Sequence, residues 1–121
     1  MKKELTPLQR EVMLKKATEQ PFTGRLLENK ESGDYLCANC GAKLFPSNSK
    51  FNSGTGWPSF DSAFPNSIKL EEDNSLGMPR TEVICSNCGI HLGHLFNDGP
   101  TKTGKRFCIN DCTLDFNKEG R

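Results

Sequence analysis

The chain lacks an excess of either charge, and it lacks any long hydrophobic run. Its 121 residues contain 16 Lys and Arg against 15 Asp and Glu, which gives a formal net charge of +1. Nucleic-acid-binding domains concentrate basic residues on one face, whereas here both signs are mixed along the chain. No apolar stretch approaches the ~20 residues that cross a bilayer. We therefore expect neither a nucleic-acid partner nor a membrane partner.

The start of the chain also lacks the features of an export signal. The sequence MKKELTP carries charge, but no apolar segment or small-residue cleavage site follows it. Paired cysteines without an export signal favour metal binding over disulfides, because the cytosol keeps thiols reduced. We expect a cytoplasmic, monomeric protein with a single domain over residues 1–121.

Four of the six cysteines form two CxxCG knuckles, at residues 37–41 and 85–89. The two-residue spacing turns both sulfurs of a knuckle toward one point, and the glycine permits the tight turn that follows. The intervening segment exceeds the roughly 15–20 residues of a compact zinc ribbon, so we expect it to be a folded piece itself. The two knuckles predict one structural Zn²⁺ per chain, with the ligands Cys37, Cys40, Cys85 and Cys88.

Local patterns predict one helix near the start, from about residue 6 to 17. Thr6 can cap this helix, and Gln9 sits where a capping box requires Glu or Gln. The residues expected to face the core are Leu8, Val12 and Met13.

Beyond Phe22 the helical period disappears, and Gly, Pro, Asn and Asp punctuate short runs that are typical of strands. We expect a mainly β domain built from antiparallel strands. The predicted strands are residues 34–37, 43–45, 67–70, 81–85, 105–110 and 113–116.

The two cysteines outside the knuckles, Cys108 and Cys112, are not needed for the metal site. In a strand over residues 105–110, side chains alternate between faces, so Arg106, Cys108 and Asn110 share one face. A guanidinium beside a sulfur favours the thiolate, which is the nucleophilic form. The alternative is an inert, half-buried cysteine within a strand.

Residues that could surround a substrate lie elsewhere in the chain. The only two histidines, His91 and His94, are not required as zinc ligands and can exchange protons near neutral pH. Asp98 is close enough in sequence to orient one of them or to hold a water molecule. A glycine-rich loop at residues 50–60 carries the only tryptophan, Trp57, as a possible ligand wall. The alternatives are satisfied surface histidines and a tryptophan packed into the core.

In combination, these stretches resemble the methionine-R-sulfoxide reductase (MsrB) family. The resemblance runs from about Leu8 to Phe116 and rests on the knuckles and on residues 18–24, 54–60, 77–83, 91–100 and 106–110. It implies two antiparallel sheets, with a structural Zn²⁺ away from the active site. It also implies reduction of methionine-R-sulfoxide, free or in oxidised proteins, as a repair reaction after oxidative stress.

By position, the resemblance assigns roles to individual residues. Cys108 matches the catalytic cysteine, and Trp57 matches the aromatic residue that contacts the substrate methyl group. The polar set around the sulfoxide oxygen is matched by His94, Asp98 and Asn110, with His91 and Arg106 beside them. We hypothesise that His94 supplies a proton, directly or through a water, while the Cys108 thiolate attacks the sulfur and becomes a sulfenic acid.

The chain departs from many relatives at Thr55, where they carry a resolving cysteine. We therefore expect thioredoxin or another small thiol to reduce the sulfenic acid directly, with Cys112 as a bystander. The alternative is a Cys108–Cys112 disulfide, although a straight strand would separate the two Cα atoms by ~13 Å.

A different class of function is a non-catalytic zinc-binding interaction module on a similar scaffold. The two knuckles alone would favour that class. Such a module has no use for a reactive thiol beside an arginine, for paired histidines or for a tryptophan loop, so we favour the enzyme.

Overall fold

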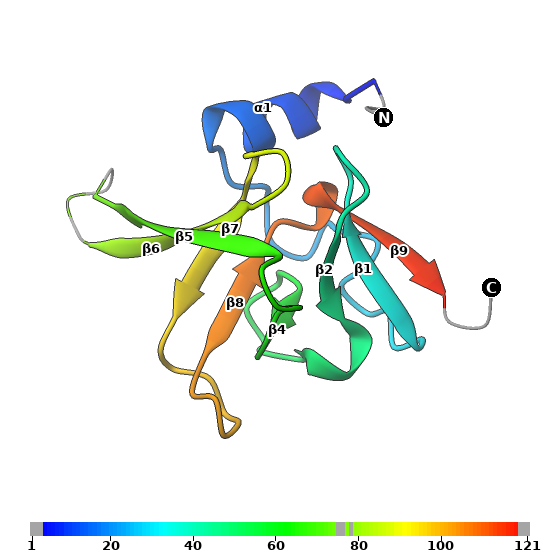
Figure 1. Cartoon of the computed structure of the whole chain (residues 1–121), viewed down its shortest axis with the longest axis vertical. Coiled ribbons are helices and arrows are strands. Elements are labelled where there is room, and N and C mark those ends of the chain that lie inside the picture. Colours follow the sequence, from blue (N-terminus) through cyan, green and yellow to red (C-terminus); the bar gives the residue numbers. More distant parts are fainter. Residues whose placement is uncertain (1–3, 75–76, 78, 119–121) are drawn as a thin grey trace.

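The computed structural model describes residues 4–74, 77 and 79–118, and it contains two antiparallel sheets and one α-helix (Figure 1). The three-stranded sheet has the order β2-β1-β9 and consists of β1 (Gly33–Cys37), β2 (Lys43–Pro46) and β9 (Leu114–Lys118). The six-stranded sheet has the order β3-β4-β8-β7-β6-β5. Its strands are β3 (Lys50–Phe51), β4 (Ser59–Phe60), β5 (Ile68–Asp73), β6 (Arg80–Cys85), β7 (His91–Phe96) and β8 (Arg106–Ile109). The predicted fold class is confirmed.

The helix α1 spans Pro7–Lys15 and has the predicted capping box. The Thr6 side chain accepts a hydrogen bond from the Gln9 backbone N–H, and the Gln9 side chain accepts one from the Thr6 N–H. The helix ends earlier than predicted because Lys16 adopts a left-handed conformation, with φ 61°. A left-handed residue closes a helix even when no proline follows at once.

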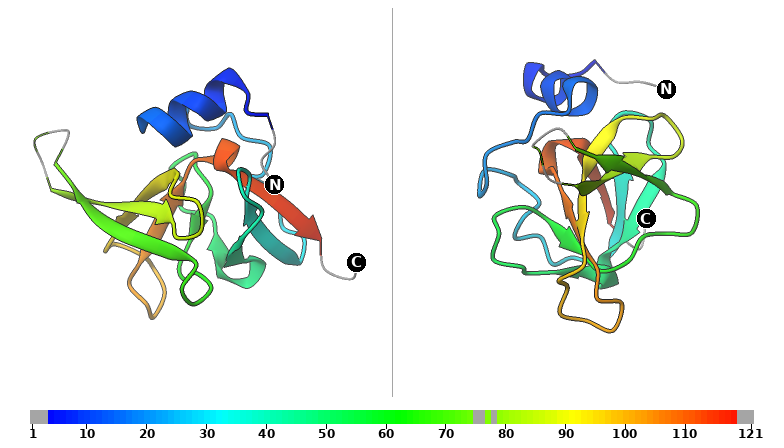
Figure 2. Two further views of the ribbon diagram at one scale, coloured as in Figure 1. Left: turned by 45° about the horizontal axis from the view of Figure 1, so that its top comes forward. Right: turned by 90° about the vertical axis from the view of Figure 1, so that its left-hand side faces the viewer.

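One end of the molecule is covered by α1, which packs against β7 and the short 3-10 helix η2 (Asp111–Thr113) (Figure 2). Val12 and Met13 are buried as predicted, whereas Leu8 is 49% exposed and its predicted burial is wrong. Gln9 takes the contact with η2 instead, because its side-chain amide donates a hydrogen bond to the Cys112 carbonyl.

Aromatic rings fill the space between the two sheets. Phe45 of β2 stacks on Phe60 of β4 with ring centroids 4.4 Å apart, and Tyr35 of β1 meets Phe60 edge-on at 5.1 Å. Phe107 of β8 lies 5.7 Å from Phe45. These contacts join the small sheet to the strand that carries Cys108, so the packing of the core fixes the position of that strand.

All six predicted strands are present with small differences in their bounds, and β3, β4 and β7 are additional. The sequence of β7 shows no alternation because its first four residues are all buried. Met78, which belongs to one of the stretches that carry the family resemblance, lies outside the described residues. Across the ranges given above, no helix has both the length and the apolar character that a membrane span requires.

Replacing Met13 by Ala should lower the free energy of unfolding by about 2–5 kcal/mol, because it leaves a cavity under α1. Leu8→Ala should change this energy by no more than about 0.5 kcal/mol, because Leu8 lies largely in solvent. Urea denaturation of both variants in the same buffer measures the difference. Equal losses would contradict the packing described for α1.

Candidate active site and metal centre

The two knuckles have the same backbone geometry. The Gly41 N–H donates to the Cys37 carbonyl at 2.8 Å, and the Gly89 N–H donates to the Cys85 carbonyl at 2.8 Å. Both glycines have a positive φ, 83° and 84°, which other residues adopt only with strain. The sequence pattern therefore predicts this local structure for a physical reason.

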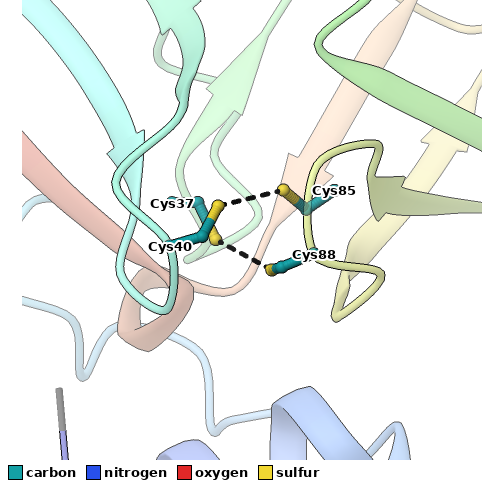
Figure 3. A group of neighbouring side chains, drawn as sticks. All are labelled: Cys37, Cys40, Cys85 and Cys88. Atoms are coloured by element: carbon teal, nitrogen blue, oxygen red, sulfur yellow. Dashed lines mark hydrogen bonds between the residues drawn. The ribbon is translucent and has the colours of Figure 1, made fainter. Parts of the chain in front are cut away.

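The four knuckle sulfurs face one another across the gap between the two sheets (Figure 3). Cys37 and Cys88 have their sulfurs 3.7 Å apart, as do Cys40 and Cys85, and all four sulfurs lie within 4.8 Å of one another. Tetrahedral zinc with Zn–S bonds of about 2.3 Å places its sulfurs about 3.8 Å apart. The cluster can therefore hold a metal ion, and Cys108 is not part of it.

The backbone register places a histidine directly beside Cys108. β8 lies between β4 and β7, and Cys108 is opposite His94 on β7 and Ser59 on β4. Opposed residues of antiparallel strands point to the same face, with Cβ atoms about 4.5–5.5 Å apart. Gly93 permits the close approach of β7 and β8, because a Cβ at this position would overlap the Cys108 carbonyl oxygen.

A cavity of about 230 Å³ opens over this face of the sheet. It brings together five of the seven residues predicted around the substrate. The residues that line it are Thr18, Thr55, Trp57, Arg80, Gly93, His94, Phe96, Arg106, Cys108 and Asn110. The alternation predicted for the Cys108 strand is also confirmed, because Phe107 and Ile109 are buried on the opposite face.

Asp98 and His91 do not line this cavity. Asp98 forms a two-point ion pair with Arg106, with N···O distances of 2.8 and 3.1 Å, and the guanidinium holds the pKa of Asp98 below its usual range. The Arg106 guanidinium also lies 4.4 Å from the centroid of the Phe96 ring. Asp98 thus holds Arg106 beside Cys108, and each histidine takes its carboxylate from another residue; the other role predicted for Asp98, holding a water molecule, stays a prediction.

The two histidines are oriented by carboxylates from other strands. His94 Nε2 lies 2.8 Å from Asp73 at the end of β5, and His91 Nδ1 lies 2.8 Å from Glu82 of β6. The two imidazole rings meet edge to face at 5.3 Å. Because Asp73 occupies Nε2 of His94, Nδ1 is the ring nitrogen left to exchange a proton with a ligand.

His91 and its carboxylate are almost completely buried. Glu82 also forms an ion pair with Lys16, at 3.1 Å, across the end of α1. Burial lowers the pKa of His91 despite the carboxylate beside it. Burial therefore favours the neutral form of His91, and within the described part of the chain its Nε2 has no hydrogen-bond partner. Its place is behind His94, as a support rather than as a cavity residue.

Burial raises the pKa of the Cys108 thiol above its ordinary value. Arg106 acts in the opposite direction, as does the hydroxyl of Thr55, and both favour the thiolate. Arg106 thus acts in the direction that the sequence predicted, but burial outweighs it. At neutral pH the resting side chain is a thiol, and a proton must leave it before or during an attack.

Cys112 lies on η2 and does not line the cavity. Burial, together with the Glu19 carboxylate, raises the pKa of Cys112 to about 12. A thiol of this kind is a poor nucleophile at neutral pH.

Trp57 and Asn110 are held in the cavity wall by the same residue, Glu19. The Trp57 indole donates to the Glu19 carbonyl at 3.0 Å, and the Asn110 side-chain oxygen accepts from the Glu19 N–H at 3.0 Å. The Asn110 amide nitrogen donates to the Leu92 carbonyl at 3.0 Å. That nitrogen carries a second hydrogen, which can be donated to a ligand.

The sequence pattern of the family described as SelR domain matches residues 5–118. "Peptide methionine sulfoxide reductase MsrB" of Methanosarcina mazei is 56% identical over 98% of this chain and 85% of its own length. The protein of that name from Leptospira interrogans is 53% identical, over 98% of this chain and 91% of its own. The chain belongs to the MsrB family of methionine sulfoxide reductases. "Methionine-R-sulfoxide reductase B3, mitochondrial" of mouse is 50% identical over 96% of this chain and 46% of its own.

A solved structure adds evidence on the fold alone. The Yippee-like domain of Mis18 matches with a TM-score of 0.60 and 18% identity, over 75% of this chain and all of that one. The MsrB family membership therefore rests on sequence, and the Mis18 domain shows that the same β scaffold occurs elsewhere.

Several residues of this MsrB site were not predicted from the sequence. Glu19, Asp73 and Glu82 act through contacts between distant segments, and single exposed or buried acids carry no pattern of their own. Glu82 has one usable signal, since it is a charged residue that directly precedes the apolar residues 83–85 of the same strand, and a charge buried there requires a partner. Arg80 lines the cavity and pairs with Asp73 at 3.4 Å.

A larger cavity, of about 560 Å³, lies on the other side of the Trp57 loop. It is lined by residues such as Phe22, Tyr35 and Lys50, and by none of the predicted catalytic residues. The smaller cavity is the candidate site because five of the seven predicted residues line it, with Cys108 and His94 among them.

Arg106→Gln should move the Cys108 pKa further up, because it removes the charge that opposes burial. The rate of Cys108 alkylation by iodoacetamide, followed by mass spectrometry between about pH 7 and 10, should then reach its midpoint at higher pH. Lys105→Gln, which changes an exposed neighbouring charge, serves as the control and should leave the midpoint in place. A midpoint that is unchanged or lower in Arg106→Gln would contradict the described role of the guanidinium.

Proposed function

We propose that the chain reduces the R epimer of methionine sulfoxide in the cavity over β8, with the Cys108 sulfur as the nucleophile. The observation that carries this proposal is the register that sets Cys108 opposite His94, inside a cavity closed by Trp57. A thiol, a proton carrier and an apolar wall are the three elements that sulfoxide reduction requires. Of the six cysteines, only Cys108 lines this cavity.

The cavity distinguishes the groups on a chiral sulfur. The indole of Trp57 offers an apolar surface for the S-methyl group, while His94 and the free amide hydrogen of Asn110 offer polar contacts for the oxygen. With Cys108 below the sulfur, three directions are fixed. Only one arrangement of methyl, oxygen and chain then places the sulfur in line for attack.

The chemical step moves one oxygen atom and two electrons. The bond between the sulfoxide sulfur and its oxygen breaks, and the oxygen becomes bonded to the Cys108 sulfur as a sulfenic acid. The sulfoxide sulfur is reduced to the thioether of methionine, and the Cys108 sulfur is oxidised by the same two electrons. The thiol proton becomes the proton of the sulfenic acid, so no further reactant enters this step.

His94 carries the proton during this step. Because Cys108 rests as a thiol, its proton passes to Nδ1 of His94 and from there to the sulfoxide oxygen, which makes the sulfur electrophilic. The Asp73 carboxylate stabilises the imidazolium that forms in between. His91 packs against this ring from behind, and Asp98 keeps Arg106 beside the developing thiolate.

Thiols from outside the chain regenerate Cys108. One thiol of thioredoxin, or a small thiol, condenses with the sulfenic acid to a mixed disulfide and water, and a second thiol releases Cys108. Thr55 supports this route, because a hydroxyl lines the cavity where many relatives carry a resolving cysteine. The raised pKa of Cys112 and its absence from the cavity wall support its role as a bystander.

We also infer that the ion held by the knuckles is Zn²⁺, one per chain. Four thiolates with tetrahedral spacing suit zinc, and an ion at this site is structural, because it would join the turn after β1 to the turn after β6. Six reduced cysteines suit a compartment such as the cytoplasm. A monomer suffices, because one chain supplies all residues of the cavity.

In an assay with dithiothreitol and racemic methionine sulfoxide, the wild-type chain should consume about half of the substrate, since only one epimer fits. Cys108→Ser should form no methionine even in a single turnover, while Cys112→Ser should match the wild type. After one equivalent of substrate without reductant, the mass of Cys112→Ser should increase by one oxygen. Turnover by Cys108→Ser, or a Cys108–Cys112 disulfide in the wild type, would refute the respective part of the proposal.

Elemental analysis should find one zinc per chain, and Cys40→Ser should reduce the zinc content and the melting temperature together, because the ion joins the two sheets. Cys112→Ser, which leaves the knuckles intact, is the matched control. If zinc stayed bound after Cys40→Ser but were lost from Cys108→Ser, the ion would be bound by Cys108, which would contradict the assignment of the metal site to the knuckles.

A further inference from the structure

Glu19 is a buried acid within residues 18–24, one of the stretches that carry the family resemblance, but the resemblance assigns it no role. It lies in the segment between α1 and β1 and is 4% exposed. Each of its four polar groups, the backbone N–H, the backbone carbonyl and both carboxylate oxygens, has a hydrogen-bond partner. A carboxylate is costly to bury, and the four hydrogen bonds of Glu19 offset that cost. A buried, fully hydrogen-bonded acid at this position suggests that it has a structural role.

The backbone of Glu19 touches both walls of the cavity. Its carbonyl accepts from the Trp57 indole, and its N–H donates to the Asn110 side-chain oxygen, both at 3.0 Å. The same segment continues along the tryptophan loop, because the Phe22 N–H donates to the Gly56 carbonyl at 2.7 Å. One residue, Glu19, therefore joins the apolar wall to the side chain of Asn110.

The side chain of Glu19 fixes that residue to the chain beyond β8. One carboxylate oxygen accepts from the Asp111 N–H at 2.7 Å, and the other accepts from the Cys112 N–H at 3.0 Å. Both partners are donors, so the position requires two acceptor oxygens. A glutamine would offer one oxygen and would turn its NH₂ group toward the second N–H. Burial raises the pKa of Glu19, and the backbone N–H groups of Cys112 and Asp111 oppose this shift by donating to the carboxylate.

We propose that Glu19 is a positioning residue that sets the spacing between Trp57 and Asn110, and hence the placement of the sulfoxide over Cys108. This inference rests on the proposed function of the cavity. Glu19 does not line the cavity, so it acts through the two residues that it holds. When its carboxylate anchor is weakened, the segment is free to shift, and the methyl wall moves relative to the oxygen site.

Glu19→Gln tests this proposal, because it keeps the shape of the side chain and removes one acceptor. We expect kcat/KM for methionine-R-sulfoxide to fall between about tenfold and a hundredfold per folded molecule. The fraction of folded protein is counted by circular dichroism and by titration of Cys108 in the Cys112→Ser background. Trp57 is the only tryptophan, so its fluorescence emission should also shift in the variant. Glu28→Gln makes the same change on an exposed residue and should alter neither quantity.

The possible outcomes distinguish failure of the Glu19 inference from failure of the proposed function. If Glu19→Gln lowers only the melting temperature, with kcat/KM per folded molecule and Trp57 emission unchanged, Glu19 is merely structural and the inference is overturned. If Glu19→Gln does not fold, Glu19→Asp keeps both acceptors on a shorter side chain and should show the same fall in kcat/KM with the same emission shift. A wild-type chain inactive on both epimers would instead refute the proposed function, even if the emission of Trp57 shifts in the variant.

Discussion

The pairing of β8 with β7 is the constraint on which the site depends. Backbone hydrogen bonds between these strands set Cys108 opposite His94, and the lack of a side chain at Gly93 lets the strands approach closely enough. A slip of one residue would turn Cys108 into the core and Phe107 into the cavity. The aromatic contacts of Phe107 and Phe60 between the sheets oppose such a slip, so the core and the site are fixed together.

The surroundings of Cys108 act in opposite directions on the pKa of its thiol. Burial in the cavity disfavours the thiolate, and Arg106 and Thr55 only partly offset it. A thiol at rest is less exposed to adventitious oxidation, because oxidation follows thiolate character. In the proposed reaction, the proton that keeps Cys108 a thiol is also the proton that the sulfoxide oxygen needs. A neighbouring histidine held by a carboxylate can therefore activate both reactants with one transfer.

The sequence was most informative where function depends on neighbours along the chain. The knuckles, the capping box at Thr6 and the alternation around Cys108 are local patterns, and the structure contains all three. Asp98 was predicted to orient a histidine or to hold a water, on the basis of nearness in sequence rather than in space. The loop that follows β7 directs Asp98 to Arg106, while His94 receives its carboxylate from Asp73 on a different strand.

The sequence by itself determined the family, predicted the four-cysteine cluster and singled out Cys108 as the candidate nucleophile, because each is encoded by residue type at short spacing. Only the tertiary structure decided which carboxylate serves which histidine, whether Cys108 rests as a thiol, and what holds Trp57 and Asn110 in place. These properties depend on burial and on hydrogen bonds between segments such as that of Glu19 and the turn at Asp111. Such contacts arise from sheet register and core packing, which no short stretch of sequence encodes.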